Sequence, residues 1–373
     1  MLQKIVATGI LLSCFLRGAS QDVTAKLTTP TTTTTTQAAD NAAPADKTSS
    51  FTFSGSADVY YRYDFAKTRA NNMTSFTNSH NSFELGMASV KLEYKHSKVS
   101  VVADLGFGKR AQEFSYNDAG IVQAIKQLFV TYAPADWIKF TAGSWATHVG
   151  YELVDPQLNR NYSMSYMFTN GPFFHTGFKA DMTAGKHGFM IGVANPTDLK
   201  SVPDGVINKK FMLAQYSLAV NDNTKIYFNY VGGKATDSSK SSQFDLVVTG
   251  KLGSKASIGY NGTVASVRQW DGEKNIDGQS WWGSAVYLSV DPKSWFGLTL
   301  RGEYINDKKT VLGIFGEEGN GFETTLSGNF KIDNLTIIPE FRLDNAKNEV
   351  FIKNDGSSVK STGSFILAAT YHF

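Results

Sequence analysis

The 373-residue sequence contains a single cysteine, Cys14, which lies near the amino terminus. If that segment is removed on export, the mature chain has no thiol, which excludes disulfides, cysteine metal sites and cysteine nucleophiles. After this segment the sequence also lacks any apolar run of eighteen residues, so no transmembrane helix is predicted. The sequence has no block of basic residues, and its 36 Lys and Arg nearly balance its 33 Asp and Glu. Nucleic acid is therefore not an expected partner.

The first fifty residues predict an export signal followed by a linker. An apolar stretch from Ile5 to Leu16 precedes the small residues Gly18-Ala19-Ser20, so residues 1–20 are predicted to be a cleaved signal peptide. A second interpretation is that Leu11-Leu12-Ser13-Cys14 is a lipoprotein cleavage box, which would leave an acylated cysteine. Residues 21–50 are rich in Thr and Ala and cannot bury a core, so they are predicted to be a disordered periplasmic linker.

From Phe51 onward, apolar and polar residues alternate with a period of two. The stretches Val99–Phe107, Phe296–Tyr304 and Leu335–Leu343 show this alternation. A strand places each set on one face, whereas a helix would scatter both sets around its surface. The many aromatic residues (26 Phe, 16 Tyr and 6 Trp) suit strands and interfacial girdles. Alternation alone also fits a soluble sandwich, so the connections between strands must decide.

The predicted connections alternate strictly between short turns and longer polar links. Short turns are predicted near 96–97, 134–136, 185–187, 221–223, 253–255, 291–293 and 333–334. Longer links are predicted at 66–81, 109–123, 146–170, 195–209, 233–242, 268–279, 305–319 and 345–361. Fifteen connections imply about sixteen strands. Residues 51–373 are therefore predicted to form an all-β, transmembrane antiparallel β-barrel with short periplasmic turns and longer extracellular loops.

Two residues of the predicted strands need separate comment. The chain ends in an alternating stretch that finishes with Phe373, and such an end resembles the closing strand of outer-membrane barrels, which the barrel-insertion machinery reads. Pro339 lies within a predicted strand and removes a ladder donor, so a β-bulge is expected there.

A more specific resemblance lies between Gly143 and Ala180. The segments Thr147–Glu152, Asn159–Ser163 and Gly171–Gly177 are similar to those of the OmpL-like β-barrel porin family of Bacteroidota. The likeness in strand layout extends from about Phe51 to Phe373. This resemblance implies an outer-membrane barrel with a porin function, and it supplies no substrate.

Strand register predicts which charged residues point into the barrel. Because a barrel of this size encloses an aqueous channel, inward charges of both signs are expected to line a hydrated lumen. These inward residues are Lys139, Lys179, Asp181, Lys225, Arg301, Glu303, Glu340 and Arg342. The link 146–170 is the longest, and in sixteen-stranded porins the third loop often folds inward. Four of its residues are candidates for a constriction with a transverse field, or alternatively cap turns at the surface: His148, Glu152, Asp155 and Arg160.

No catalytic, cofactor or metal site is predicted. The six histidines are scattered, and only His148 and Glu152 form a spaced pair, without a His-Glu-x-x-His pattern around them. A structural histidine in a packed loop is the favoured interpretation. The chain is therefore expected not to be an enzyme.

The predicted function is that of an outer-membrane porin that lets small hydrophilic solutes diffuse passively. Outer-membrane lipid is its expected surrounding, and a homotrimer is one compatible assembly. A ligand-selective channel, for example for sugars, is the alternative if aromatic residues line the lumen. Candidates for such a track are Trp145, Tyr151, Tyr162, Tyr166 and Trp295, which interfacial girdles explain equally well. A structural or adhesive barrel ranks last, because links of about 10 to 25 residues are too short for a folded external domain.

Overall fold

The computed structural model describes residues 49–203, 209–236, 239–270 and 272–373. The predicted signal peptide, the Cys14 lipidation alternative and nearly all of the predicted linker lie outside these residues. The first strand begins at Ser49, slightly before the predicted start of the barrel. Among the described residues, no helix is long and apolar enough to span a bilayer.

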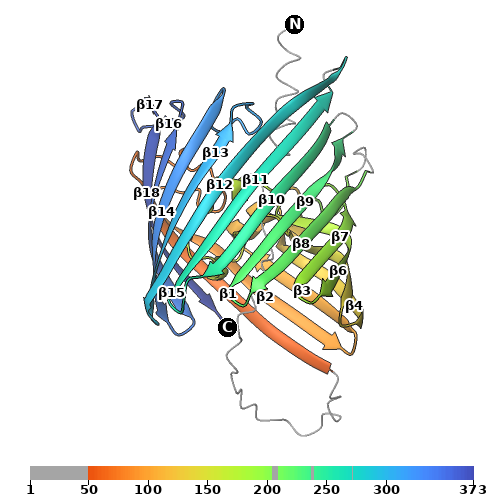
Figure 1. Ribbon diagram of the computed structural model, residues 1–373. Coiled ribbons are helices and arrows are strands. Elements are labelled where there is room, and N and C mark those ends of the chain that lie inside the picture. Colours follow the sequence, from red (N-terminus) through yellow and green to blue (C-terminus); the bar gives the residue numbers. More distant parts are fainter. Residues whose placement is uncertain (1–48, 204–208, 237–238, 271) are drawn as a thin grey trace.

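Sixteen strands of the described residues close into one antiparallel barrel (Figure 1), as the alternation and the turns predict. Sequential strands pair with each other, and β1 pairs with β18 to close the ring. The first eight are β1 (Ser49–Asp64), β2 (Ser82–His96), β3 (Val99–Phe107), β4 (Ile125–Ala135), β5 (Ile138–Ala146), β6 (Phe174–Ala184), β7 (His187–Ala194) and β8 (Phe211–Asn221). The other eight are β9 (Thr224–Thr236), β10 (Ser239–Lys251), β11 (Ala256–Trp270), β12 (Asn275–Lys293), β13 (Phe296–Asp307), β14 (Gly319–Ile332), β15 (Leu335–Ala346) and β18 (Ser361–His372).

The remaining elements are short and belong to the connections. β16 (Phe351–Ile352) and β17 (Ser358–Val359) form a small hairpin between β15 and β18. The helical turns are α2 (Lys109–Phe114), η1 (Gly120–Ala124), η2 (Pro156–Leu158) and α3 (Tyr166–Asn170).

Tight turns gather at one end of the barrel, called the turn end, and most longer connections gather at the other, called the loop end. The predicted long links 233–242 and 268–279 were wrong, because β9–β10 and β11–β12 extend through most of them. The predicted link 233–242 begins at Gly233, yet Gly233 pairs in register with Ser241, and Gly232 before it pairs with Ser242. Glycine also adopts extended backbone, so its presence alone does not end a strand.

The bulge expected at Pro339 does not form. Pro339 pairs with Leu367 in an unbroken ladder with β18. On the β14 side the ladder lapses between Ser327–Glu340 and Phe330–Ile337, and it resumes in the same register. The missing N–H therefore interrupts one ladder locally without shifting the strand.

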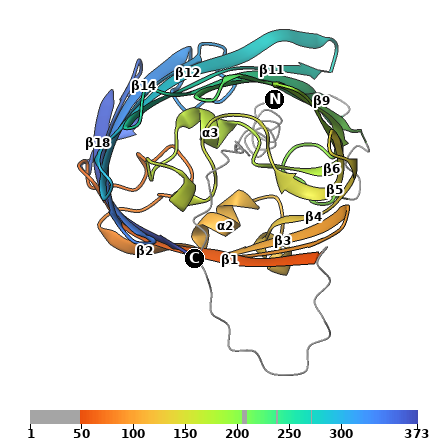
Figure 2. The ribbon, with the colours of Figure 1, turned by 60° about the horizontal axis from the view of Figure 1, so that its bottom comes forward.

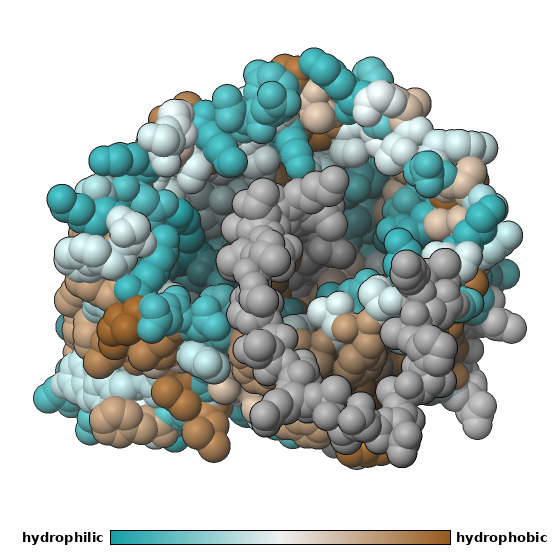
Figure 3. All heavy atoms as spheres, turned by 90° about the horizontal axis from the view of Figure 1, so that it is seen from below, coloured by the Kyte–Doolittle hydropathy of each residue, from teal (hydrophilic) through white to brown (hydrophobic). Residues whose placement is uncertain are grey.

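The outer face of the barrel carries exposed apolar side chains at alternate strand positions, as a lipid-facing belt requires. Aromatic residues cluster near the turn end, where the tilted rings of Phe296 and Phe330 lie 4.9 Å apart and those of Phe53 and Phe373 lie 5.6 Å apart between centroids. Viewed from this end, hydrophilic residues surround a central hollow (Figure 3). Examples of the outward apolar residues are Val101, Leu128, Val130, Ile191, Phe228, Leu288, Leu300, Leu326 and Phe341.

Connections fold back into the barrel and build a second core inside it. L3, defined as residues 147–173 between β5 and β6, crosses the interior together with α2 from the β3–β4 connection (Figure 2). The apolar residues of L3 pack with aromatic residues of the β1–β2 and β3–β4 connections. The buried cluster consists of Phe76, Phe114, Val154, Met164, Phe168, Phe173 and Phe174.

Candidate functional site

L3 is held against one wall of the barrel by two carboxylates that each accept two successive backbone N–H groups. Glu340 on β15 accepts from Tyr162 at 2.7 Å and from Ser163 at 2.9 Å. Glu303 on β13 accepts from the first two residues of α3, Tyr166 at 2.6 Å and Met167 at 2.7 Å. Each carboxyl group thereby satisfies two backbone donors that L3 cannot pair by itself. These two carboxylates therefore fix both the position and the direction of L3.

Two wall arginines complete this attachment. Arg301 donates to Glu152 of L3 at 2.6 Å and to the Ser163 carbonyl at 2.7 Å, and its Nε pairs with Glu323. Arg342 donates to the Met164 carbonyl at 2.6 Å. The side chain of Arg301 is 0% exposed, so it must remain paired. Losing one partner would leave an uncompensated buried charge.

The four wall residues predicted to line a hydrated lumen on this side point inward, as their register requires. L3 covers them, however, and they contact protein instead of solvent: Arg301, Glu303, Glu340 and Arg342. Alternation determines the direction of a side chain, and it does not determine what a loop places in front of it.

L3 also contacts a second part of the wall, formed by β8–β11. The N–H of Gly150 donates to Asp245 at 2.9 Å, and Asn229 and Asn261 donate to the same carboxylate. Nε2 of His148 lies 3.0 Å from the Tyr230 carbonyl oxygen. L3 thus bridges the interior, and the segment 148–151, called the bridge contact, rests on the wall.

The remaining charges of L3 are paired within the barrel. Asp155 accepts from Lys126 at 2.5 Å, and Lys126 also lies 3.0 Å from Asp104. Arg160 forms a two-pronged pair with Asp291 at the turn end of β12. The four residues predicted as a constriction therefore do not face one another across a passage. They lie along L3, each with a partner on the wall.

Three of the other four predicted inward charges lie toward the turn end of β5 and β6, and the fourth, Lys225, lies on β9. Asp181 is 3.4 Å from Lys179 and 3.7 Å from Lys139, whose side chain is 51% exposed. The Lys179 ammonium lies 5.5 Å from the ring centroid of Trp145. This cluster is separate from the L3 charges and keeps contact with solvent.

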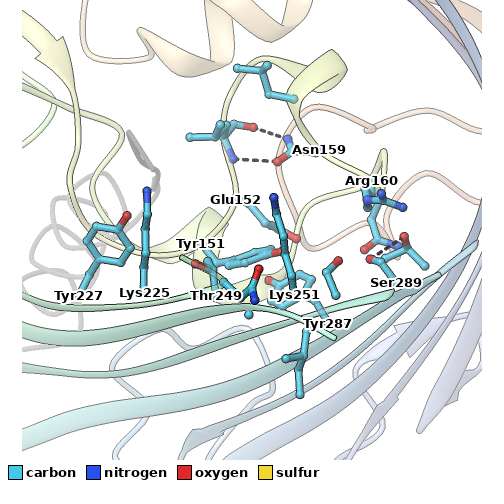
Figure 4. Close-up of a pocket in the computed structure, with 18 of the residues that line it drawn as sticks. Tyr151, Glu152, Asn159, Arg160, Lys225, Tyr227, Thr249, Lys251, Tyr287 and Ser289 are labelled. Carbon is cyan, nitrogen blue, oxygen red and sulfur yellow. Dashed lines mark hydrogen bonds between the residues drawn. The ribbon is translucent and has the colours of Figure 1, made fainter. Parts of the chain in front are cut away.

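Two cavities lie on opposite sides of the bridge contact, and both use β9–β12 as their wall. The turn-end cavity has a volume of about 350 Å³ and is lined by Lys225, Lys251, Arg160 and Tyr287 among others (Figure 4). The loop-end cavity, of about 360 Å³, is lined by Trp281 and by residues of β10 and β11 further along the same strands. The bridge contact of L3 therefore lies between these two cavities.

Burial changes the ionisation of groups at the ends of L3. Desolvation lowers the pKa of His148 to about 4, so the ring is neutral at pH 7. Desolvation also raises the pKa of Asp198, in the β7–β8 connection, to about 7. Asp198 accepts from the N–H groups of Phe173 and Phe174 at 2.7 and 2.9 Å, so a third carboxylate holds the end of L3.

His148 and Glu152 do not form a metal or acid–base pair. Glu152 is engaged by Arg301 and by the Ser165 N–H, whereas the His148 ring lies 5.4 Å from that of His175. Within the described residues, no group of three or more His, Cys, Asp or Glu is placed to hold a metal ion.

The wall residues that receive L3 were not predicted from the sequence. Asp245 was not singled out, although it accepts hydrogen bonds at the bridge contact. Small residues at inward positions were the available signal. A β-carbon on Gly259 would lie 2.5 Å from the Tyr151 ring, and one on Gly283 would lie 2.5 Å from Met167. Both glycines leave the space that L3 fills.

A closed sixteen-stranded barrel with an apolar outer belt, short turns at one end and an internal third loop defines the class of outer-membrane porins. The chain belongs to the OmpL-like family described as "Putative beta-barrel porin-2, OmpL-like", whose model matches residues 50–373. The protein is thus an outer-membrane porin of the bacterial outer membrane.

Solved structures with a similar fold come from several bacterial outer membranes. An anion-selective porin from Comamonas acidovorans has a TM-score of 0.59 at 11% identity, covering 87% of this chain and 100% of that one. The channel DcaP of Acinetobacter baumannii has a TM-score of 0.57 at 10% identity, covering 87% and 97%. OmpT of Vibrio cholerae, in a trimer form, has a TM-score of 0.55 at 11% identity, covering 87% and 99%. At such identities the likeness concerns the fold. No curated protein matches the sequence.

Proposed function

We propose that small hydrophilic solutes diffuse through this barrel along the wall of β8–β12, and that the bridge contact sets the narrowest point of their route. One observation carries the proposal. Both cavities border the same strands and lie on either side of the contact between Gly150 and Asp245, whereas L3 covers the inner face of β13–β15. The proposal includes no catalytic step.

Conductance of the folded chain in planar bilayers tests this route. We expect discrete channels in the native protein and a higher single-channel conductance in Asp245→Ala, because the substitution removes the acceptor that holds Gly150. A hydrogen bond to a charged group contributes about 1.5–3 kcal/mol, enough to loosen the bridge contact. Asp136→Ala, at an exposed turn position between β4 and β5 that lines neither cavity, is the matched control.

The outcomes separate the alternatives. Absence of current from both the native protein and Asp245→Ala would refute the channel and favour a structural or adhesive barrel. Current that is unchanged in Asp245→Ala would refute the route along β8–β12.

Ion selectivity tests the role of Arg160. Of the four predicted constriction residues, we expect Arg160 to contact passing solutes. Arg160 lines the turn-end cavity, and its side chain is 33% exposed. Glu152 and Asp155 hold L3 instead. Arg160→Glu should shift the reversal potential in a salt gradient toward cation preference, whereas Lys308→Glu, in an exposed connection, should not. An unchanged reversal potential in Arg160→Glu would remove Arg160 from the route.

We propose further that the barrel assembles as a homotrimer and that Phe373 serves recognition by the insertion machinery. The trimer form of the similar OmpT of Vibrio cholerae supports the first part. An exposed Phe373 ring, on a residue whose N–H and C=O both bond to Gly55, supports the second. Native mass measurement in detergent should give three chains per particle. Deletion of Phe373 should lower the yield of inserted barrel, and a monomeric mass or an unchanged yield would refute the respective part.

A further inference from the structure

The turn-end cavity carries positive charge that the protein does not compensate. Lys225 on β9 and Lys251 on β10 extend from neighbouring strands into this cavity (Figure 4). Among the described residues, no oxygen accepts a hydrogen bond from either ammonium group, and neither forms an ion pair. Arg160 lies in the same lining.

The carboxylates nearby do not neutralise these lysines. Glu152 lines the cavity, but its two oxygens are taken by Arg301 and by the Ser165 N–H. Asp291 lies beside Arg160 and is shared between Arg160 and Lys331. Asp222 lines the cavity from an exposed turn. The cavity thus presents an excess of cationic groups to its contents.

The rest of the lining is suited to hydroxylated molecules. Tyr151 and Tyr287 stack with 4.1 Å between their ring centroids. Hydroxyl groups of Thr249, Ser257 and Ser289 contribute donors and acceptors to the lining. Aromatic faces take up the apolar faces of sugar rings, and hydroxyls pair with sugar hydroxyls. The volume of about 350 Å³ lies in the usual range for small-molecule sites, roughly 300–1,000 Å³.

We infer that the turn-end cavity is a binding site for a monosaccharide-sized polyhydroxy anion, either a sugar carboxylate or a sugar phosphate. The ammonium groups of Lys225 and Lys251 hold the anionic group, and the stacked tyrosines and the hydroxyls receive the sugar body. This inference gives the proposed channel a preferred solute class. It rests on that channel function only for the entry of the solute, because binding can be measured without conduction.

Calorimetric titration of the detergent-solubilised barrel is the direct test, with glucuronate, glucose 6-phosphate, glucose and inorganic phosphate as probes. We expect saturable binding of at least one of the two sugar anions, on the order of tenfold tighter than glucose or inorganic phosphate. The two sugar anions distinguish a carboxylate from a phosphate ligand. Lys225→Gln with Lys251→Gln should reduce the affinity to that of glucose, and Lys225→Arg with Lys251→Arg should restore it.

Lys255→Gln is the matched control, because this lysine lies in the β10–β11 turn outside the cavity lining. Heat-modifiable migration on gels verifies that each variant is a folded barrel. Equal affinity of the native protein and the double Gln variant would overturn the inference, as would binding of glucose or inorganic phosphate as tight as that of the sugar anions. Because these readouts do not require current, failure of the channel proposal and failure of the binding site are distinguishable.

Discussion

At the scale of single residues, side chains of the same charge serve opposite purposes in two parts of the barrel. Arg301 and Lys225 both point inward from their strands, yet L3 buries Arg301 completely while Lys225 borders a cavity. A buried cation is stable only when anions pair with it, and Arg301 forms ion pairs with Glu152 and Glu323. A cation beside a cavity can remain available to a solute. Position relative to L3, rather than residue type, decides the role.

His148 gives the bridge contact a defined pH dependence. Its pKa in the folded protein is lowered to about 4 by burial, against an ordinary value near 6.5. The unfolded state therefore binds a proton first as the pH falls below 6.5, so the folded state loses stability between about pH 6.5 and pH 4. Lys179, Asp181 and His175 are the titratable groups that face this ring.

We expect the native protein to lose about 2–3 kcal/mol of unfolding free energy between pH 7 and pH 4.5 relative to His148→Gln. Urea unfolding followed by tryptophan fluorescence at the two pH values measures this difference. Parallel loss in both proteins would show that His148 is not the group responsible.

At the scale of elements, L3 behaves as a folded segment with its own attachments. Glu303 and Glu340 each accept from two successive backbone N–H groups of L3, and Asp198 accepts from the last residue of L3, Phe173, and from the first residue of β6, Phe174. Backbone groups inside a barrel need such partners, since L3 has few regular ladders of its own. The wall carboxylates therefore replace the hydrogen bonds that secondary structure would supply.

Glu303→Gln should release part of L3. A neutral amide offers one acceptor oxygen and turns an NH₂ group toward a backbone donor, so the attachment should weaken by about 1.5–3 kcal/mol. Trypsin should then cleave after Arg160 faster than in the native protein, as mass spectrometry of the fragments can show. Glu349→Gln, in an exposed connection, should leave the cleavage rate unchanged. Equal rates in Glu303→Gln and the native protein would contradict the assigned role.

The strands could be predicted from the sequence, whereas the attachments of L3 could not. A period of two and the tight turns predicted the sixteen-stranded barrel and the inward residues, because both depend on local geometry. The pairing of Glu340 with Tyr162 joins residues 178 positions apart, and no local pattern specifies it. The predicted link that begins at residue 233 was wrong, because β9 continues to Thr236 and pairs with β10. Gly259 was a usable sign of the L3 contact, because its missing side chain makes room for Tyr151.

At the scale of the whole molecule, the barrel has two apolar regions that serve different surroundings. The outer belt faces lipid, and the cluster around Phe114 and Phe173 lies inside among the connections. The wall between these two regions consists of strands whose successive side chains point alternately outward and inward. A charge added on the outer face should therefore cost stability according to its depth in the bilayer.

Leu300→Lys, near the middle of β13, should lower the unfolding free energy in lipid by about 2–4 kcal/mol. Ile332→Lys, at the turn end of β14, should cost roughly 0–1 kcal/mol because its ammonium reaches the interface. Denaturant titration in lipid vesicles provides both values. Equal losses at the two positions would show that they do not differ in depth.

The distance along the chain between L3 and its attachments has a consequence for biogenesis. Glu303 and Glu340 follow their L3 partners by 137 and 178 residues, so they come from strands made long after L3 leaves the ribosome. L3 can make all of its attachments only when its own strands β5 and β6 and the distant strands β13–β15 stand in the same sheet. Complete seating of L3 therefore depends on the nearly complete ring and not on any single hairpin.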